Sequence, residues 1–417
     1  MPSNEPVFSD LDTYASRVSP PDDFTDSFLQ ERHSLRTRAG NLLESERLQG
    51  CGRKRTGPNV EMWRGCNGAT HFRGVETCGS IWLCPVCSAK IAHKRSIEVQ
   101  DLADAHEKAG GAVYMATFTM RHHLFNRVAD LKSTITKAWQ KMQSGAPWGR
   151  LKNEHGISHA VRALEVTHGG NGWHPHLHVL LLTEAALDET EIDLMRFDLF
   201  DRWATKIKSL NGTTEIGAFD LRKASSGIEA ASYIAKWGAG HEIAKGAGKS
   251  ASGRSVWDLL KASEFDPEAG RLFKEYAEAF KGARHLTYSK GSREAYDLRD
   301  PETDLELAID GATAGEEVDK ETGEVSTIET GRIWMADSGT WNKCVKLKIL
   351  PLLLEAGRED GSEGIDRLLE RYDCHSYFDA KEHPAPAYKP PPEPRRRAFD
   401  PAGIFTSFKS AMEAEIG

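Results

Sequence analysis

Three histidines alternate with other residues in GWHPHLHVLLL, residues 172–182, a segment that ends in a run of aliphatic side chains. Alternate residues of a β-strand share one face, so His176 and His178 can direct two imidazole nitrogens at one ion. The aliphatic residues that follow are typical of a strand anchored in a hydrophobic core. The pattern favours a metal site at His176 and His178. Solvated or hydrogen-bonded histidines at a polar strand end are the alternative.

A carboxylate lies in the apolar segment just before these histidines, at Glu165 of VRALEVTHG. The Gly/Asn turn between the two segments predicts a hairpin, which places Glu165 across from the histidines. A carboxylate on an apolar strand face is costly unless it is paired or binds a metal. Two imidazoles and one carboxylate leave coordination positions open, which suits Mg²⁺ or Mn²⁺ acting on phosphate, and zinc or iron also fits. A surface position at the strand end is the alternative for Glu165.

Most of the cysteines are clustered near the start of the chain, which in a cytosolic protein favours a metal over disulfides. The segment TCGSIWLCPVC supplies Cys78, Cys84 and Cys87, the last two as a C-x-x-C pair. A tetrahedral zinc site needs a fourth ligand, and either Cys51 or Cys66 can supply it. We expect a structural zinc site. Reduced free cysteines are the alternative.

A tyrosine and a carboxylate lie four residues apart in GIEAASYIAKWGAG. Glu229 and Tyr233 therefore share one face of the expected helix, with Lys236 three residues further on. A tyrosine with a carboxylate one turn away can act as a nucleophile beside a water-activating base. A tyrosine in a helix of this composition is also commonly a core residue, and that interpretation stays open.

The elements that must position these residues lie between residues 110 and 240. Periodicity and turn chemistry predict the order strand, helix, hairpin, helix, strand, helix. This order indicates an α+β fold with one central antiparallel sheet, ferredoxin-like or split βαβ in style.

Composition and periodicity predict further segments around this catalytic unit. They are a disordered lead (1–30), a helix with a cysteine-rich module and a basic helix (31–109), the catalytic domain (110–240), its helical extension (241–300), an acidic linker (301–332), a small helical unit (333–380), and a proline-rich linker with a terminal amphipathic helix (381–417).

Charge is unevenly distributed along the chain, although the formal net charge is −8. Basic residues outnumber acidic ones in residues 31–100, and the reverse holds in residues 301–380. This asymmetry is compatible with a DNA-binding region attached to another unit. The sequence has no apolar run as long as a membrane span, and its first residues do not resemble a secretory signal, so we expect a cytoplasmic protein.

The candidate segments, taken in order, resemble the motifs of the HUH endonucleases, and more closely those of replication initiator (Rep) proteins of rolling-circle plasmids. ATFTMRHH resembles the first motif, HPHLHVLLL the metal-binding second motif, and EAASYIAK the third motif with its Tyr-x-x-Lys core. TCGSIWLCPVCSAKI with the upstream CGR cysteine resembles the cysteine-rich segment of a subgroup of these initiators. KGARHLTYSKGSR resembles a stretch that follows the catalytic domain in that subgroup.

This resemblance implies an enzyme that nicks and rejoins single-stranded DNA at a specific site with the help of Mg²⁺ or Mn²⁺. It implies that His176, His178 and Glu165 are the metal ligands. Tyr233 would attack the phosphate to give a 5′-phosphotyrosine link and a free 3′-OH primer, and Lys236 would stabilise charge. His174 would support the ligands rather than bind the metal.

The single tyrosine of this helix resembles a variant of the family in which a carboxylate, here Glu229, activates water for the terminating hydrolysis. The implied partners are single-stranded or supercoiled DNA at a replication origin, a host helicase and a host polymerase. Basic residues of the front region are expected to hold the phosphate backbone. They are Arg53, Lys54, Arg55, Lys94 and Arg95.

Two other functions remain open from the sequence. A rolling-circle transposase or a relaxase would use the same chemistry in another genetic setting. A zinc-containing DNA-binding regulator without catalysis would use HPHLH only as structure.

Overall fold

The computed structural model describes residues 25–65, 68–235, 253–296, 298, 303–309, 316–318, 325–327 and 331–374. The expected lead as far as residue 24, and the proline-rich linker and terminal helix expected after residue 380, lie outside these residues.

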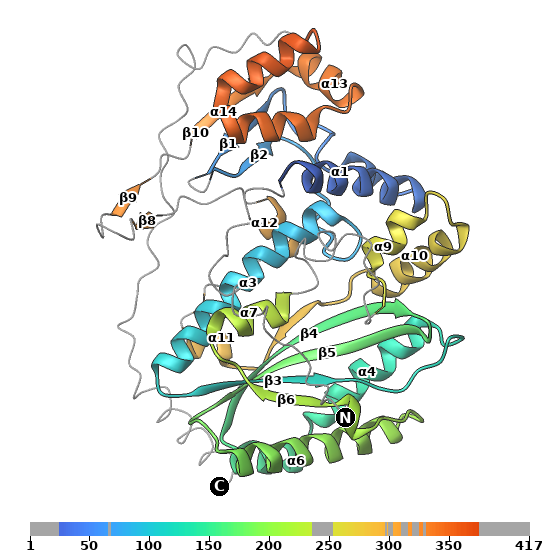
Figure 1. The fold of residues 1–417 in the computed structure, drawn as a ribbon, viewed down its shortest axis with the longest axis vertical. Coiled ribbons are helices and arrows are strands. Elements are labelled where there is room, and N and C mark those ends of the chain that lie inside the picture. The colour runs from blue at the N-terminus through green and yellow to red at the C-terminus, as the bar shows by residue number, and fades with distance from the viewer. Residues whose placement is uncertain are drawn as a thin grey trace, which may run out of the picture.

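A five-stranded antiparallel sheet forms the centre of the larger part of the molecule, in the order β6-β3-β5-β4-β7 (Figure 1). Its strands are β3 (Ala112–Phe118), β4 (Ile157–Gly169), β5 (Gly172–Thr183), β6 (Asp220–Lys223) and β7 (Leu286–Tyr288). Within this sheet, β3, β4, β5 and β6 have the split βαβ order, and β7 adds an edge strand beside β4. The predicted combination of helices with an antiparallel sheet is therefore confirmed.

Helices cover both faces of this sheet. One face packs on α3 (Pro85–Lys108) and α7 (Gly227–Ala235), and the other on α4 (Val128–Met142), α5 (Ala146–Glu154) and α6 (Glu189–Lys208). Side chains alternate between the two cores along each strand, as the two-residue period of a strand requires. On β3, for example, Val113 and Met115 face α3 and α7, whereas Tyr114 and Ala116 face the other core.

The hairpin between β4 and β5 depends on a glycine at its turn. Gly172 has a φ of +86°, and a Cβ atom there would lie 2.9 Å from the Cα of Leu124. Both the left-handed backbone and the close approach favour glycine. The turn sets the register of the two strands and thereby the position of every side chain along them.

A second, three-stranded sheet in the order β10-β1-β2 lies at the other end of the molecule (Figure 1). It joins β1 (Val60–Arg64) and β2 (Thr70–Arg73) to β10 (Gly331–Ala336), so that Met62 pairs with Trp334. The helices α13 (Ser338–Lys346) and α14 (Leu350–Arg371) pack against this sheet and share one core with it. Residues assigned from the sequence to two different segments thus form one unit.

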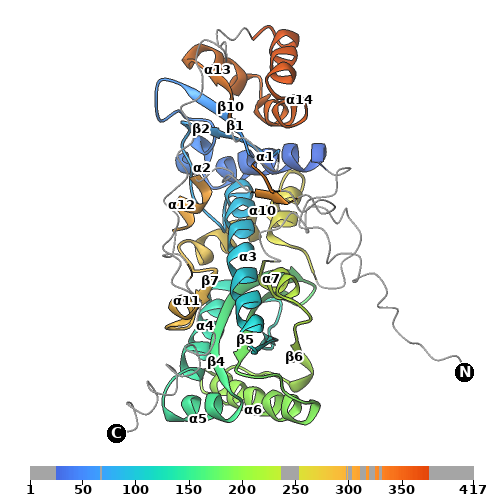
Figure 2. The ribbon, with the colours of Figure 1, turned by 90° about the vertical axis from the view of Figure 1, so that its left-hand side faces the viewer.

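The long helix α3 connects the two ends of the molecule, as Figure 2 shows. Next to its start, Trp82 donates from Nε1 to the carbonyl of Ala283 at 2.7 Å, and the Tyr276 hydroxyl donates to the Trp82 carbonyl at 2.7 Å. The cysteine-rich segment therefore packs on the residues that lead into β7.

Shorter elements complete the described structure. They are α1 (Thr25–Leu42), α2 (Glu46–Gly50), the 3-10 turn η2 (Ile216–Ala218), α9 (Val256–Ala262), α10 (Pro267–Phe280), α11 (Ser292–Ala295), α12 (Asp304–Ile309), β8 (Glu316–Val318) and β9 (Val325–Thr327). Among the described residues, no helix combines the length and the apolar character needed to cross a bilayer.

Candidate active site

Glu165, His176 and His178 meet on the sheet face that α3 and α7 cover. The register of β4 and β5 places Glu165 opposite His176, and places Ala163 opposite His178. Glu165 Oε2 lies 2.8 Å from Nε2 of His178 and 3.3 Å from Nε2 of His176. The hairpin thus brings together the three residues that the sequence proposed as a set.

The chemistry of this cluster suits a divalent cation. Burial favours a higher pKa for Glu165, but the two neighbouring histidines outweigh it and hold the pKa well below the usual range. One donor atom from each residue lies within 4.8 Å of the other two. A buried carboxylate with two imidazole nitrogens is a mixed N/O donor set that Mg²⁺, Mn²⁺ or Zn²⁺ can occupy. The residues therefore fit a metal, and Glu165 with its two histidines would hold it.

His174 lies one strand repeat before the ligand pair and contacts it through backbone and ring. Its carbonyl oxygen accepts a hydrogen bond from Nδ1 of His176 at 3.2 Å, which leaves Nε2 of His176 directed at Glu165. The ring of His174 stacks on that of His122, with centroids 5.0 Å apart. A partner on the second ring nitrogen fixes the orientation of a metal-binding histidine. These contacts match a supporting position for His174.

Tyr233 of α7 packs directly on His178. The two ring centroids are 4.4 Å apart at an interplanar angle of 66°, and Tyr233 is 4 % exposed. Its hydroxyl lies 2.5 Å from Oγ1 of Thr117, which is itself 3.4 Å from Nδ1 of His178. Burial raises the pKa of Tyr233 well above its usual value, although the Thr117 contact acts in the opposite direction. The phenol is therefore protonated at neutral pH and needs an activating group to become a nucleophile.

Glu229 lies one turn before Tyr233, at the start of α7, and is bound by nearby donors. Its carboxylate accepts from Nη1 of Arg222 at 2.9 Å, and from both the backbone N–H and the hydroxyl of Ser225 at 2.7 Å. Burial favours a higher pKa for Glu229, but Ser225 and Arg222 lower it below the usual value. The carboxylate thus ties Ser225, just ahead of α7, to the first turn of that helix, and its lowered pKa favours the charged form. Lys236 lies outside the described residues.

Comparison with known proteins identifies the family of the chain. Residues 70–332 match the model of a family described as "Replication protein". The chain belongs to this family. The match covers more than half of the chain and confirms the resemblance to plasmid replication initiators.

Two curated relatives are similar to this replication protein. "Protein rep" of Streptomyces lividans is 29% identical over 328 residues, which cover 60% of this chain and 71% of that protein. "Neomycin resistance protein" of Streptomyces cyanogenus is 36% identical over 140 residues, which cover 28% of this chain and 32% of that protein. No solved structure matches this chain.

The replication protein also holds a cluster of four buried cysteines. Cys51 Sγ lies 3.6 Å from Sγ of Cys87 and 4.0 Å from Sγ of Cys84, and Cys78 Sγ lies 3.5 Å from Sγ of Cys87. Four thiolates at this spacing can hold a metal such as zinc in tetrahedral geometry. The structure brings in Cys51 as the fourth member, while Cys66 lies outside the described residues.

The surroundings of the cysteine cluster support its use as a metal site. Four thiolates around Zn²⁺ leave a net negative charge that nearby cations can balance. The half-buried Lys90 is such a cation: burial lowers its pKa, and the nearby Cys87, Cys51 and Cys84 act in the opposite direction. Burial and the charge of Arg36 likewise lower the pKa of Arg53, and Cys51 opposes them.

The basic residues expected to bind DNA in the front region have partners within the chain. Arg53 donates to Oγ1 of Thr37, and Lys54 pairs with Glu76 at 2.7 Å. Arg55 donates to two backbone carbonyls of the turn that follows it, at 2.9 and 2.8 Å. The side chain of Lys54 is accessible, because 70% of it is exposed.

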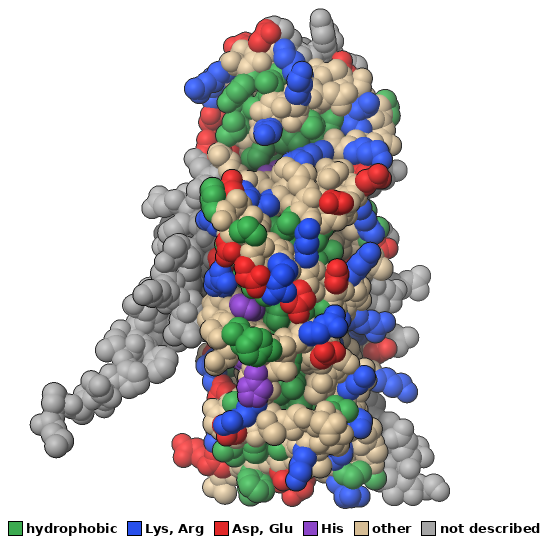
Figure 3. All heavy atoms as spheres, turned by 90° about the vertical axis from the view of Figure 1, so that its right-hand side faces the viewer, with side chains coloured by type: hydrophobic (Ala, Val, Ile, Leu, Met, Phe, Trp, Pro, Cys, Tyr) green, Lys and Arg blue, Asp and Glu red, His purple; other side chains and the backbone are tan. Residues whose placement is uncertain are grey.

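The two basic residues expected to bind DNA from the long helix lie together on α3. Arg95 pairs with Glu98 at 3.0 Å and with Asp304 at 3.9 Å, and Lys94 beside it is half-buried. Figure 3 shows cationic and acidic side chains interspersed over the face that it presents. Binding of DNA by these five residues of the replication protein therefore stays a prediction.

Sequence reasoning missed two residues of this site, Thr117 and His122. Both lie in the segment ATFTMRHH. Thr117 shares the face of Val113 and Met115 on β3, so a hydroxyl on an otherwise apolar face was the available signal. His122 follows the strand, and only the tertiary structure places it on His174.

Proposed function

We propose that this protein starts rolling-circle plasmid replication by nicking one strand of origin DNA and later rejoining it. The observation that supports this most directly is the contact of Tyr233 with His178, because it brings a tyrosine hydroxyl beside a cluster suited to a divalent metal. A site-specific endonuclease and strand transferase needs both groups at one phosphate.

In the first step, the Tyr233 oxygen attacks the scissile phosphorus and its phenol proton passes to solvent, while the P–O3′ bond breaks and the leaving 3′-oxygen takes up a proton. The products are a 5′-phosphotyrosine link and a free 3′-OH that a host polymerase can extend. Thr117 orients the phenol through its 2.5 Å hydrogen bond, and Lys236 stabilises the charge on the phosphate. A bound Mg²⁺ or Mn²⁺ supplies Lewis-acid polarisation of the phosphate. Glu165, His176 and His178 would hold that ion.

Termination is assigned to Glu229 in this proposal, because α7 carries a single tyrosine. The carboxylate would take a proton from water as that water hydrolyses the phosphotyrosine link. Arg222 and Ser225 keep it charged and fix its position one turn from Tyr233.

The remaining parts of the proposal concern the framework and the partners. The four-cysteine cluster binds structural zinc and anchors the start of α3. Arg53, Lys54, Arg55, Lys94 and Arg95 contribute to backbone contacts with single-stranded or supercoiled origin DNA. A host helicase opens the strands behind the nick, and the reaction takes place in the cytoplasm.

A nicking assay tests the central step. Supercoiled plasmid carrying the cognate origin is incubated with the protein and Mg²⁺ or Mn²⁺, and relaxed DNA bound covalently to protein is measured. We expect the adduct with the wild type and none with Tyr233→Phe. An adduct formed by Tyr233→Phe would show that Tyr233 is not the nucleophile. Absence of nicking by the folded, metal-loaded wild type would favour the non-catalytic DNA-binding regulator.

A further inference from the structure

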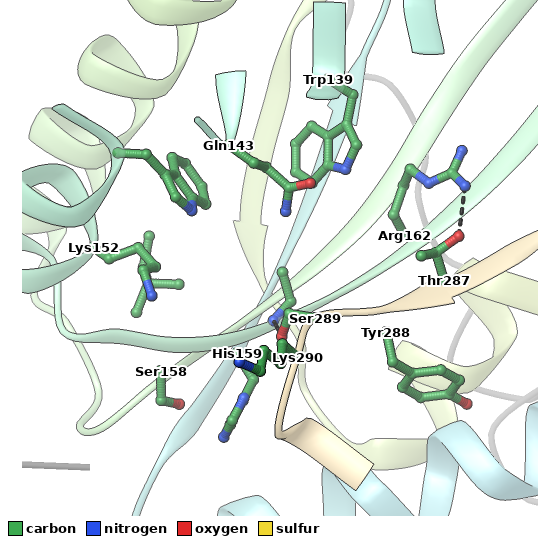
Figure 4. A pocket seen from close by; sticks show the side chains of 13 residues that line it. Trp139, Gln143, Lys152, Ser158, His159, Arg162, Thr287, Tyr288, Ser289 and Lys290 are labelled. Atoms are coloured by element: carbon green, nitrogen blue, oxygen red, sulfur yellow. Dashed lines mark hydrogen bonds between the residues drawn. The ribbon is translucent and has the colours of Figure 1, made fainter. Parts of the chain in front are cut away.

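A pocket of about 370 Å³ opens on the sheet face opposite to the metal cluster (Figure 4). Helices α4 and α5 form one wall, and the strands β4 and β7 form the other. Arg162 of this pocket and Glu165 of the metal cluster are three residues apart on β4, so their side chains point to opposite faces. The pocket is therefore separate from the candidate active site, although the same strand serves both.

The pocket carries positive charge. Lys152, Arg162 and Lys290 contribute to its lining, and among the residues that the structure describes no Asp or Glu does so. The guanidinium of Arg162 donates to Oγ1 of Thr287 at 2.6 Å, a bond drawn in Figure 4. Burial lowers the pKa of Arg162 to about 10, and no carboxylate contributes to that shift.

The half-buried guanidinium of Arg162 has the Thr287 hydroxyl beside it, and no carboxylate lies among the described residues that line the pocket. Such a group suits an anionic ligand, and phosphate matches the planar donor fork of arginine. The two lysines at the same pocket can contact neighbouring phosphates of a strand.

The inner wall of the pocket is aromatic. Trp139 and Trp148 line it, and their ring centroids are 6.3 Å apart at an angle of 69°. Both indoles belong to the hydrophobic core and are only 5% and 8% exposed, so they close the pocket as an apolar wall. The volume lies in the range of small-ligand pockets.

We propose that this pocket holds a short segment of the single DNA strand, with backbone phosphates placed along it at Arg162, Lys290 and Lys152. The proposal rests on the proposed nicking function, because an enzyme that cuts one strand must hold that strand beyond the scissile phosphate. The edge strand β7 and the two residues after it line one side of the pocket, so the bound strand would run along this edge of the sheet.

The test measures strand binding without cleavage, in a Tyr233→Phe background. A fluorescein-labelled oligothymidylate is titrated with protein at several salt concentrations, and anisotropy gives Kd and its salt dependence. Lys152→Glu and Lys290→Glu should each raise Kd about tenfold and lower the salt slope by about 0.7 for each phosphate that the variant no longer neutralises. The matched controls are Lys141→Glu and Lys281→Glu, which change the same charge at exposed lysines outside the pocket.

Equal rises in Kd for the pocket variants and for the controls would overturn the proposal, because general electrostatics would then explain the binding. Arg162→Lys and Arg162→Gln, compared at matched thermal stability, give a second measurement. Arg162→Lys should bind the oligonucleotide more tightly than Arg162→Gln. Wild-type affinity in both variants would also overturn the proposal.

A second arm distinguishes a strand from a free nucleotide. Thymidine monophosphate is titrated while tryptophan fluorescence is recorded. The monophosphate could quench the fluorescence of the wild type but not that of Lys290→Glu, while all variants keep their affinity for oligothymidylate. That result would show a site for a free nucleotide and overturn the strand proposal. Adduct formation by the protein that retains Tyr233 tests nicking separately, so failure of one proposal is distinguishable from failure of the other.

Discussion

The hydroxyl of Tyr233 lies 2.5 Å from Oγ1 of Thr117, although the two residues are 116 positions apart in the chain. Thr117 comes from β3 and Tyr233 from α7, and both contact His178 of β5. Three elements thus converge on one phenol, whose orientation depends on its hydrogen bond with a threonine hydroxyl.

Thr117→Val should slow adduct formation without removing it. The valine keeps the shape of the side chain but cannot form the hydrogen bond, which is worth about 0.5–1.5 kcal/mol, or roughly a twofold to thirteenfold change in rate. Because this bond lowers the pKa of Tyr233, its loss should raise that pKa and reduce the phenolate fraction at every working pH. Single-turnover nicking at several pH values measures both effects.

Thr119→Val is the matched control for that change. The hydroxyl of Thr119 donates to the carbonyl of Ala218 at 2.9 Å, so this substitution alters a hydrogen bond of the same kind away from the phenol. A Thr117→Val protein with the rate and pH profile of the wild type would contradict the orienting role.

Glu165→Gln should weaken binding of the divalent metal while leaving the fold intact. The substitution removes the charge of a three-residue donor set and leaves two imidazoles. Calorimetric titration with Mn²⁺ should show affinity reduced by at least about tenfold, since the carboxylate supplies the charge that hard cations favour. Glu154→Gln alters the exposed carboxylate of another His/Asp/Glu group and should leave the affinity as it is. The reverse ranking of the two variants would place the metal elsewhere.

Cys51→Ser should lower the zinc content of the purified protein and its thermal stability, because Cys51 is the fourth thiol of the cluster. Zinc content per chain, measured by atomic emission, and the Tm check this. Cys66→Ser is the matched comparison and should keep its zinc. Loss of zinc from Cys66→Ser with retention in Cys51→Ser would exchange the two assignments.

Glu229→Ala should nick DNA and then accumulate the covalent adduct, because the hydrolysis then has no general base. The change also removes the hydrogen bonds that this carboxylate accepts from Arg222 and Ser225, each worth about 1 kcal/mol. Ser225→Ala removes one partner of the carboxylate and separates the two effects. An adduct that turns over in Glu229→Ala as in the wild type would remove the water-activating role. Accumulation in both variants alike would assign the effect to these local hydrogen bonds.

His71 should make the protein less stable in mild acid. Burial, followed by the charges of Lys90, Arg73 and Lys94, lowers the pKa of His71 to about 3, against an ordinary value near 6.5. A histidine whose pKa is lower in the folded state than in the unfolded state stabilises the fold above its unfolded-state pKa. That stabilisation is lost as the pH falls from the unfolded-state pKa towards the folded-state pKa. The free energy of unfolding should therefore decrease by up to about 1.4 kcal/mol per pH unit below pH 6.5 from this group.

The difference in urea unfolding between the wild type and His71→Gln, measured from pH 7 to pH 5, isolates this contribution. His123→Gln changes an exposed histidine and serves as the control. A His71→Gln protein whose stability falls with pH as steeply as that of the wild type would contradict the prediction.

Local sequence determined the metal half of the candidate site. The alternation of GWHPHLHVLLL, the glycine turn and the carboxylate of VRALEVTHG all lie within one hairpin, so a two-residue period and one turn set the register that joins Glu165 to His176. The short-range helix spacing likewise placed Glu229 one turn from Tyr233. These relationships join residues that are close in the sequence, so the regular geometry of one helix or one hairpin determines which side chains share a face.

Only the tertiary structure decided the relationships between distant segments. The contact of Tyr233 with His178, the choice of Cys51 as the fourth thiol and the pairing of β1 with β10 each join elements with no shared periodicity. The pocket around Arg162 forms because α4 and α5 pack beside β4 and β7. Such contacts form when the apolar faces of separate elements pack against one another. The sequence pattern shows which face of each element is apolar, but it does not show which other element covers that face.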